Sequence, residues 1–256
     1  MSNKREREKR REARERDESQ VNAKDRRTRM LQIAAGAVFL VLAAVVVLIV
    51  VNSSSSGGGD ASNLKEVSAV DSLVAGVPQS NMVLGDPSAK VELIEFGDLQ
   101  CPICKAYSEE VLPQVIEGQV AQGQAKIDFR NYAFIGPQSA SAGAAALAAG
   151  AQGRGWNYLE LFYRNQGKEN SGYADDEFLT AVAKGAGVKD ISRWNEERNG
   201  AKFKQEVEET TSEAENELGF TGTPSFAIKG PSTNGLELLG TPKRTGEIQE
   251  AINKAS

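Results

Sequence analysis

The chain has 256 residues, of which 40% are apolar and 25% are charged, enough to bury the core of one sizeable domain and too apolar for a disordered protein. It contains no histidine, which excludes Ser-His and Cys-His catalysis and metal sites built on imidazole. The net charge of −5 is uneven, since residues 1–30 carry 12 Lys and Arg against 7 Asp and Glu while the remainder carries 18 against 28. Any catalysis must therefore use thiols and carboxylates.

The charged N-terminal segment, residues 1–31, mixes both signs and contains no aromatic residue. A nucleic-acid interface would combine a cleaner basic patch with aromatic side chains. We therefore expect a solvated cytoplasmic tail and no nucleic-acid partner.

An apolar run follows, the 19 residues from Ile33 to Val51. As a helix it would cover roughly 28 Å, close to the hydrocarbon thickness of a bilayer. Basic residues precede the run and the first charge after it is Asp60, so the positive-inside rule places the N-terminus in the cytoplasm. Residues 32–51 are thus predicted to be a single transmembrane anchor, with the rest of the chain extracytoplasmic. A cleaved secretion signal is the alternative, although its apolar region is usually only about 7–15 residues long.

A Ser/Gly-rich stretch, Asn52 to Gly59, comes next and has the composition of a flexible tether. We assign residues 52–75 to this linker and residues 76–256 to one folded domain.

Within this domain the apolar pattern alternates between the periods of strands and of helices. Residues 137–218 are helical throughout, and the apolar residues Trp156, Leu159, Phe162 and Tyr163 at helical spacing are expected in the core. The remaining elements are strands at 90–96, 125–132, 225–228 and 236–239 and helices beginning at Pro102 and at Thr245. The predicted order is β-α-β, a helical block, then β-β-α.

The only two cysteines, Cys101 and Cys104, stand three residues apart where the first strand passes into a helix. This spacing is typical of a redox pair that makes and breaks its own disulfide. Half of a zinc site is the alternative, but zinc needs four ligands and the chain has no further Cys or His. At the helix N-terminus Cys101 faces free backbone N–H groups, which should lower its thiol pKa. Cys104 lies one turn further on and should be less exposed, suited to resolving mixed disulfides.

Two segments carry a family resemblance: Phe96-Gly97-Asp98-Leu99-Gln100-Cys101-Pro102-Ile103-Cys104 and Gly222-Thr223-Pro224-Ser225-Phe226. They resemble the DsbA-like branch of the thioredoxin superfamily over residues 80–256. The resemblance implies an α/β fold of the thioredoxin type with an inserted helical domain, here about 137–218. It also implies that Cys101 is an exposed nucleophile and that Pro224 is cis and lies beside it.

Further site residues follow from these motifs. A cis proline leaves the Thr223 backbone available to pair with an extended substrate, and Pro102 and Ile103 lie between the cysteines, where they can tune the thiol. Glu95 shares a strand face with Val91 and Leu93, so burial should raise its pKa and allow it to exchange a proton with Cys104. A carboxylate at a strand end can also simply be solvated.

These observations predict a membrane-tethered protein thiol:disulfide oxidoreductase that needs no cofactor or metal beyond the Cys101–Cys104 disulfide. Its substrates would be extracytoplasmic proteins with free thiols, and a quinone-linked membrane partner would reoxidise it. The best-known oxidases of the family have histidine where this chain has Ile103, so a reductase or isomerase is the alternative enzyme. A non-catalytic module that binds proteins is the alternative of another class.

Overall fold

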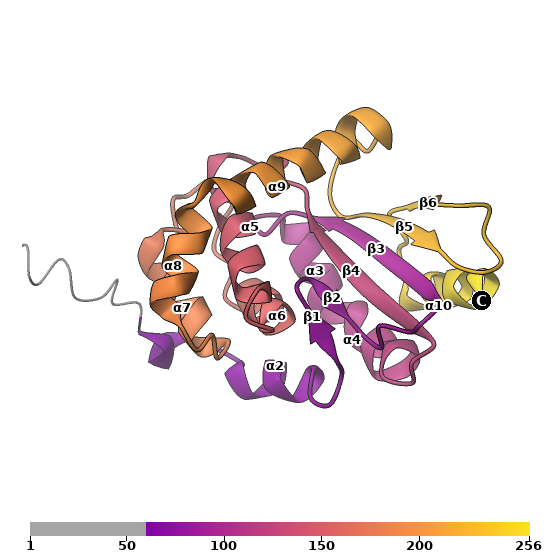
Figure 1. Cartoon of the computed structure of the whole chain (residues 1–256), viewed down its shortest axis with the longest axis horizontal. Coiled ribbons are helices and arrows are strands. Elements are labelled where there is room, and N and C mark those ends of the chain that lie inside the picture. The colour runs from indigo at the N-terminus through magenta and orange to yellow at the C-terminus, as the bar shows by residue number, and fades with distance from the viewer. Residues whose placement is uncertain (1–59) are drawn as a thin grey trace, which may run out of the picture. The chain divides into compact units, whose positions relative to one another are not determined.

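The computed structural model describes residues 60–256 (Figure 1). The predicted tail, residues 1–31, and the predicted anchor, residues 32–51, lie outside this part of the chain. Among residues 60–256, no helix is both long and apolar enough to cross a membrane.

A six-stranded sheet forms the centre of the domain, in the order β1-β2-β4-β3-β5-β6. Strands β3 and β4 pair in parallel, and the other neighbours are antiparallel. The strands are β1 (Gln79–Ser80), β2 (Val83–Leu84), β3 (Val91–Gly97), β4 (Ala125–Asn131), β5 (Ser225–Lys229) and β6 (Glu237–Gly240). The four strands predicted from the sequence correspond to β3 to β6.

Strand β3 is buried on both faces, as a central strand requires. Leu93 belongs to the larger apolar cluster on one face, and Ile94 and Phe96 belong to a smaller cluster on the other. Because successive side chains alternate, Glu95 points to the same face as Leu93. The predicted alternation of β4 is also confirmed, since Ile127 and Phe129 are buried while their neighbours are partly exposed.

Helices cover the sheet, and a separate cluster of helices is inserted in the sequence between β4 and β5 (Figure 1). The elements outside that cluster are the 3₁₀ turn η1 (Ala61–Asn63), α2 (Val67–Leu73), α3 (Pro102–Glu110), α4 (Leu112–Val115), the π turn η2 (Ile116–Val120) and α10 (Thr245–Ala255). The inserted cluster consists of α5 (Pro137–Gly150), α6 (Gly155–Arg164), α7 (Asp176–Gly185), α8 (Ile191–Asn199), α9 (Ala201–Ser212) and the π turn η3 (Glu213–Glu217). The predicted insertion, about 137–218, matches these bounds.

The alanine-rich helix α5 lies at the centre of the insertion, where it packs against α6, α8 and α9. Its small side chains allow the indole of Trp194 on α8 to reach its backbone, where Nε1 donates to the carbonyl oxygen of Ala145 at 2.8 Å. On α6, Trp156 donates in the same way to Met82 at 2.7 Å. The four apolar residues expected in the core of this helix are all nearly fully buried, so that prediction is confirmed.

The N-terminal boundary of the domain differs from the prediction. Helix α2 lies inside residues 52–75, the segment assigned to a flexible linker, and it packs against α6. Val70 and Val74 are buried, and with Leu64 and Val67 they form an apolar stripe at helical spacing. The linker assignment is therefore wrong for residues 60–75.

The short hairpin of β1 and β2 was not predicted either. It extends the sheet beyond β4 and also contacts α6. The backbone at its tip packs so closely against Gly150 that a Cβ at that position would lie 2.8 Å from the carbonyl oxygen of Asn81. Such a close approach requires glycine. The spacing of apolar residues in the sequence does not reveal this requirement.

Candidate active site

Cys101 occupies the N-cap of α3, directly after the loop that follows β3. Its Sγ accepts a hydrogen bond from the backbone N–H of Cys104 at 3.4 Å. Pro102 takes the first helical position, where its missing N–H leaves no bond unmade. The predicted placement of the pair at a strand-to-helix junction is thus what the structure shows. Both cysteines are free thiols, so this is the reduced state.

The second motif meets the first because β5 runs antiparallel to β3, with Ser225 opposite Phe96. The Thr223–Pro224 peptide bond is cis, as the resemblance implies. The Cys101 thiol donates to the carbonyl oxygen of Thr223 at 3.4 Å, across a separation of 122 residues. The structure therefore brings together Cys101, Cys104 and the proline loop.

Exposure around the pair differs from the expectation for the nucleophile. Cys101 is only 4% exposed, not open to solvent, and Cys104 is fully buried. Ile103 between them is 56% exposed. A protein substrate therefore meets the Ile103 side chain first, and the Cys101 sulfur lies recessed beside the proline loop.

The two thiols have pKa values shifted in opposite directions. The pKa of Cys101 is lowered to about 6, chiefly by the hydrogen bond from the Cys104 side chain. Hydrogen bonds from Thr223 and from backbone N–H groups lower it further, while burial opposes the shift. Burial is the largest of the effects that raise the pKa of Cys104 well above its ordinary value, followed by the hydrogen bond to Cys101. This arrangement gives one ready nucleophile and one thiol that needs a base.

Glu95 is buried, and neither of its carboxylate oxygens has a hydrogen-bond partner. Burial, followed by the charges of Glu160 and Cys101, raises its pKa to about 8. The charge of Glu95 in turn contributes to the raised pKa of Cys104. A buried carboxyl that titrates near neutral pH and interacts with the buried thiol can exchange a proton with it.

The loop before Cys101 is held by residues that sequence reasoning missed. Asp98 is buried, and its carboxylate accepts hydrogen bonds from the backbone N–H groups of Gln100, Phe134 and Ile135 at 2.7 to 2.8 Å. From the insertion, Nε2 of Gln166 donates to the carbonyl oxygens of Leu99 at 2.7 Å and Cys101 at 3.1 Å. The insertion therefore fixes the backbone on which the nucleophile sits.

These pKa values predict selective alkylation. Because the Cys101 thiolate forms near pH 6, we expect the rate of its reaction with iodoacetamide to rise to a plateau with a midpoint near pH 6. Cys104 in the folded protein should stay unmodified up to pH 8. Mass spectrometry after timed labelling measures both sites. A midpoint for Cys101 near the ordinary thiol value of about 8.5 would contradict the geometry described above.

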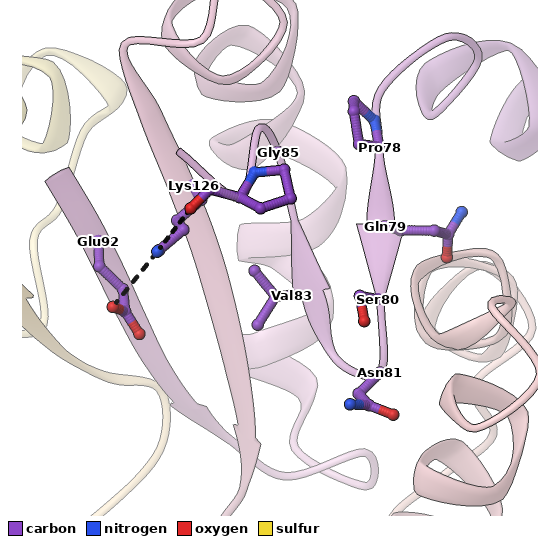
Figure 2. A pocket seen from close by; sticks show the side chains of 9 residues that line it. Pro78, Gln79, Ser80, Asn81, Val83, Gly85, Glu92 and Lys126 are labelled. Carbon is purple, nitrogen blue, oxygen red and sulfur yellow. Dashed lines mark hydrogen bonds and ion pairs between the residues drawn. The ribbon is translucent and has the colours of Figure 1, made fainter. Parts of the chain in front are cut away.

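A surface cavity of about 300 Å³ lies away from the thiols (Figure 2). It is bounded by the β1–β2 hairpin and by Glu92 and Lys126, whose side chains form an ion pair at 3.9 Å. Glu92 and Lys126 stand near the starts of the parallel strands β3 and β4, whereas Cys101 follows the end of β3. The cavity is therefore at the opposite end of the sheet from the redox pair.

Comparison with known proteins agrees with this geometry. The protein-family model described as "Thioredoxin" matches residues 78–254. "Probable disulfide bond formation protein D" of Bacillus cereus is 29% identical over 154 residues, which cover 59% of this chain and 71% of the relative. "Disulfide bond formation protein D" of Bacillus subtilis is 26% identical over 159 residues, which cover 60% and 71%.

Solved structures show the same fold. Oxidised BdbD from Bacillus subtilis aligns with a TM-score of 0.60 at 24% identity, covering 70% of this chain and 96% of that one. Wolbachia pipientis alpha-DsbA1 aligns with a TM-score of 0.56 at 21% identity, covering 71% and 91%. With a family model matched over most of its length, the chain belongs to the thioredoxin family and is a thiol:disulfide oxidoreductase.

Proposed function

We propose that this protein is an oxidase that introduces disulfides into extracytoplasmic proteins while tethered to the membrane by residues 32–51. The observation that carries the direction of electron flow is the low pKa of Cys101, about 6. A stabilised thiolate favours the reduced dithiol over the disulfide, so the disulfide gives up its oxidising equivalents readily. The names of the Bacillus relatives, which refer to disulfide formation, support the same direction.

In the proposed cycle a substrate thiolate attacks Sγ of Cys101 in the oxidised protein, and the Cys101–Cys104 bond breaks. Cys104 leaves as a thiolate and takes up a proton from Glu95. A second substrate thiolate then attacks the mixed disulfide, which forms the substrate disulfide and releases the Cys101 thiolate. The two electrons remain on the cysteine pair, so no other cofactor is needed. A quinone-linked membrane partner would remove them.

Recognition of the substrate would use backbone groups beside the proline loop. Ile103 offers an exposed apolar contact and Thr223 lies next to the sulfur. Binding through the backbone of an extended segment is independent of the substrate's side chains, which suits an enzyme that acts on many proteins.

The reduction potential of the Cys101–Cys104 couple tests this function. A value well above the about −270 mV of a reductase, toward the about −120 mV of a strong oxidant, is expected, and a value near about −270 mV would instead identify a reductase. Equilibration of the purified domain, residues 60–256, with glutathione buffers provides the measurement. If the domain neither oxidises nor reduces a model dithiol peptide, it is a binding module and the proposal fails.

The tether has its own test. Protease added to intact cells should remove the domain after residue 52 and leave a membrane-bound N-terminal fragment, because the basic residues before the apolar run keep that end inside. Immunoblotting with an N-terminal tag detects the fragment. A mature chain that starts near residue 52 in the medium would show a cleaved signal in place of an anchor.

Ile103 provides a test of tuning at the site. Replacing Ile103 by His places a donor, and at lower pH a cation, beside the Cys101 thiolate, so the pKa of Cys101 should fall and the couple should become more oxidising. One charge-assisted contact of about 1.4 kcal/mol corresponds to about 30 mV for a two-electron couple. Ile103→Leu is the matched control and should leave the potential unchanged. Unchanged values in the His variant would show that this side chain does not reach the sulfur.

A further inference from the structure

The loop between β3 and α3 is bound along its length by one segment of the insertion, the end of α6 and the turn that follows it. Near the end of α6, the hydroxyl of Tyr163 donates to the carbonyl oxygen of Asp98 at 3.2 Å. In the turn, the backbone N–H of Asn170 donates to Oε1 of Gln100 at 3.1 Å. Gln166 lies between these two residues in the sequence and binds the loop as well. The insertion therefore contacts the active-site loop at several successive residues.

Gln166 is the residue of this segment that contacts the nucleophile. Its Nε2 carries two hydrogens, and its two acceptors are the carbonyl oxygens of Leu99 at 2.7 Å and of Cys101 at 3.1 Å. The Cys101 carbonyl also accepts from the backbone N–H of Lys105 at 3.1 Å, at the start of α3, and the Cys101 N–H donates to the carbonyl of Asp98 at 3.0 Å. Both ends of the Cys101 backbone are therefore held by hydrogen bonds.

The orientation of the Cys101 carbonyl is linked to the position of the sulfur. Cys101 is the N-cap of α3 and has extended backbone angles, φ −74° and ψ 120°. Rotation about ψ moves the carbonyl oxygen and also turns the side chain relative to the free N–H groups of the first helical turn. At the observed angle, Sγ lies 3.4 Å from the backbone nitrogen of Cys104, where the helix N-terminus favours a thiolate. A hydrogen bond that fixes the carbonyl therefore also fixes the sulfur in this position.

We propose that Gln166 is a positioning residue of the reaction, through which the insertion holds the Cys101 peptide in the orientation that activates the sulfur. The step concerned is the attack of the Cys101 thiolate on a disulfide. A bond forms between the Cys101 sulfur and one sulfur of that disulfide, the disulfide bond breaks, and the other sulfur leaves as a thiolate. Gln166 acts through the backbone and takes no part in these bond changes. The inference rests on the proposed role of Cys101 as the nucleophile, and it holds for either direction of electron flow.

Replacing Gln166 by Met keeps the length of the side chain but removes both donors. The Cys101 peptide is then free to rotate, and the thiolate loses part of its alignment with α3. We expect the midpoint pH for alkylation of Cys101 to rise by about half a pH unit, so that below the midpoint the thiolate fraction falls roughly threefold. A threefold weaker preference for the thiolate makes the Cys101–Cys104 couple more reducing by about 15 mV.

The matched control is Gln152→Met. Gln152 also belongs to the insertion, and its Nε2 also donates to a backbone carbonyl, that of Asp190 at 2.9 Å. Three quantities are measured on the purified full-length proteins. They are the pH dependence of iodoacetamide labelling at Cys101, the reduction potential in glutathione buffers, and the free energy of unfolding of the oxidised and the reduced forms.

The comparison of oxidised and reduced forms separates positioning from support of the fold. A glutamine that only supports the fold stabilises both forms equally, so its loss leaves the midpoint and the potential unchanged. That result is expected for Gln152→Met. Gln166→Met should destabilise the reduced form more than the oxidised form, because the alignment matters most when Cys101 carries a charge. If Gln166→Met fails to fold, Gln166→Asn replaces it, since its shorter amide cannot keep both bonds and should shift both values in the same direction by less.

The outcomes distinguish this inference from the role of Cys101 on which it rests. If the wild-type midpoint lies near pH 6 but neither Gln166 variant moves it or the potential, Gln166 has no positioning role while Cys101 remains the activated nucleophile. A wild-type midpoint near the ordinary thiol value of about 8.5 would show that Cys101 is not activated, and the inference would fail with that role. Equal shifts in the Gln166 and Gln152 variants would reflect a general weakening of the insertion and would also overturn the proposal.

Discussion

Replacing Cys104 by Ser should leave substrates trapped on Cys101 as mixed disulfides. The Cys101 thiolate, formed near pH 6, still attacks a disulfide, but no thiol remains at the next turn of α3 to displace the bound substrate. An intramolecular thiol held in place competes far better than a free one, so release should slow roughly a hundredfold or more. Serine keeps a hydroxyl that can donate to the thiolate, which preserves the nucleophile.

Adducts are measured by non-reducing electrophoresis of acid-quenched cells, followed by mass spectrometry of bands that collapse on reduction. The control is the double variant in which Cys101 is also replaced by Ser, which should carry none. A Cys104→Ser protein that stays free of adducts under oxidising conditions would show that exchange does not pass through Cys101.

Replacing Asp98 by Ala should unfold the active-site loop and destabilise the domain. Three backbone N–H groups donate to this buried carboxylate, and each donor left unsatisfied costs about 1–3 kcal/mol. We expect the free energy of unfolding to fall by roughly 3–5 kcal/mol, a large part of the 5–15 kcal/mol typical of a domain. Burial raises the pKa of Asp98 in spite of these hydrogen bonds, which shows that the charged carboxylate is costly to bury. The loss of unfolding free energy should therefore be smaller than the sum of three strong hydrogen bonds.

Urea unfolding followed by tryptophan fluorescence measures this change, since Trp156 and Trp194 are both buried. Asp98→Asn is the matched control and should lose less, because its amide oxygen still accepts. A loss below about 1 kcal/mol in the Ala variant would mean that water satisfies the three donors.

The strands, the order of the elements and the insertion could be predicted because they depend on local periodicity. β3 is buried on both faces and β4 on one, and each pattern is visible in its own seven residues. The position of Cys101 at a helix N-terminus followed from Pro102 in the same way.

What escaped prediction depends on contacts between distant segments. Asp98 and the backbone that it binds are 36 and 37 residues apart, and Gln166 is 65 residues from Cys101. Cys101 is only 4% exposed, and its thiol contacts Thr223, which is 122 residues away in the sequence. The buried carboxyl of Glu160 likewise accepts a hydrogen bond from Ser108, which is 52 residues away in the sequence.

The hydrogen bonds that join Gln166 and Thr223 to Cys101 have a consequence for the protein during its synthesis. Gln166 and Thr223 are made 65 and 122 residues after Cys101. Until they have been translated and packed, Cys101 lacks these contacts to its backbone and sulfur. A nascent chain therefore lacks part of the environment that lowers the pKa of Cys101 in the folded domain. The full activation of Cys101 requires the folded domain, so an unfinished copy should be a poorer catalyst of thiol-disulfide exchange.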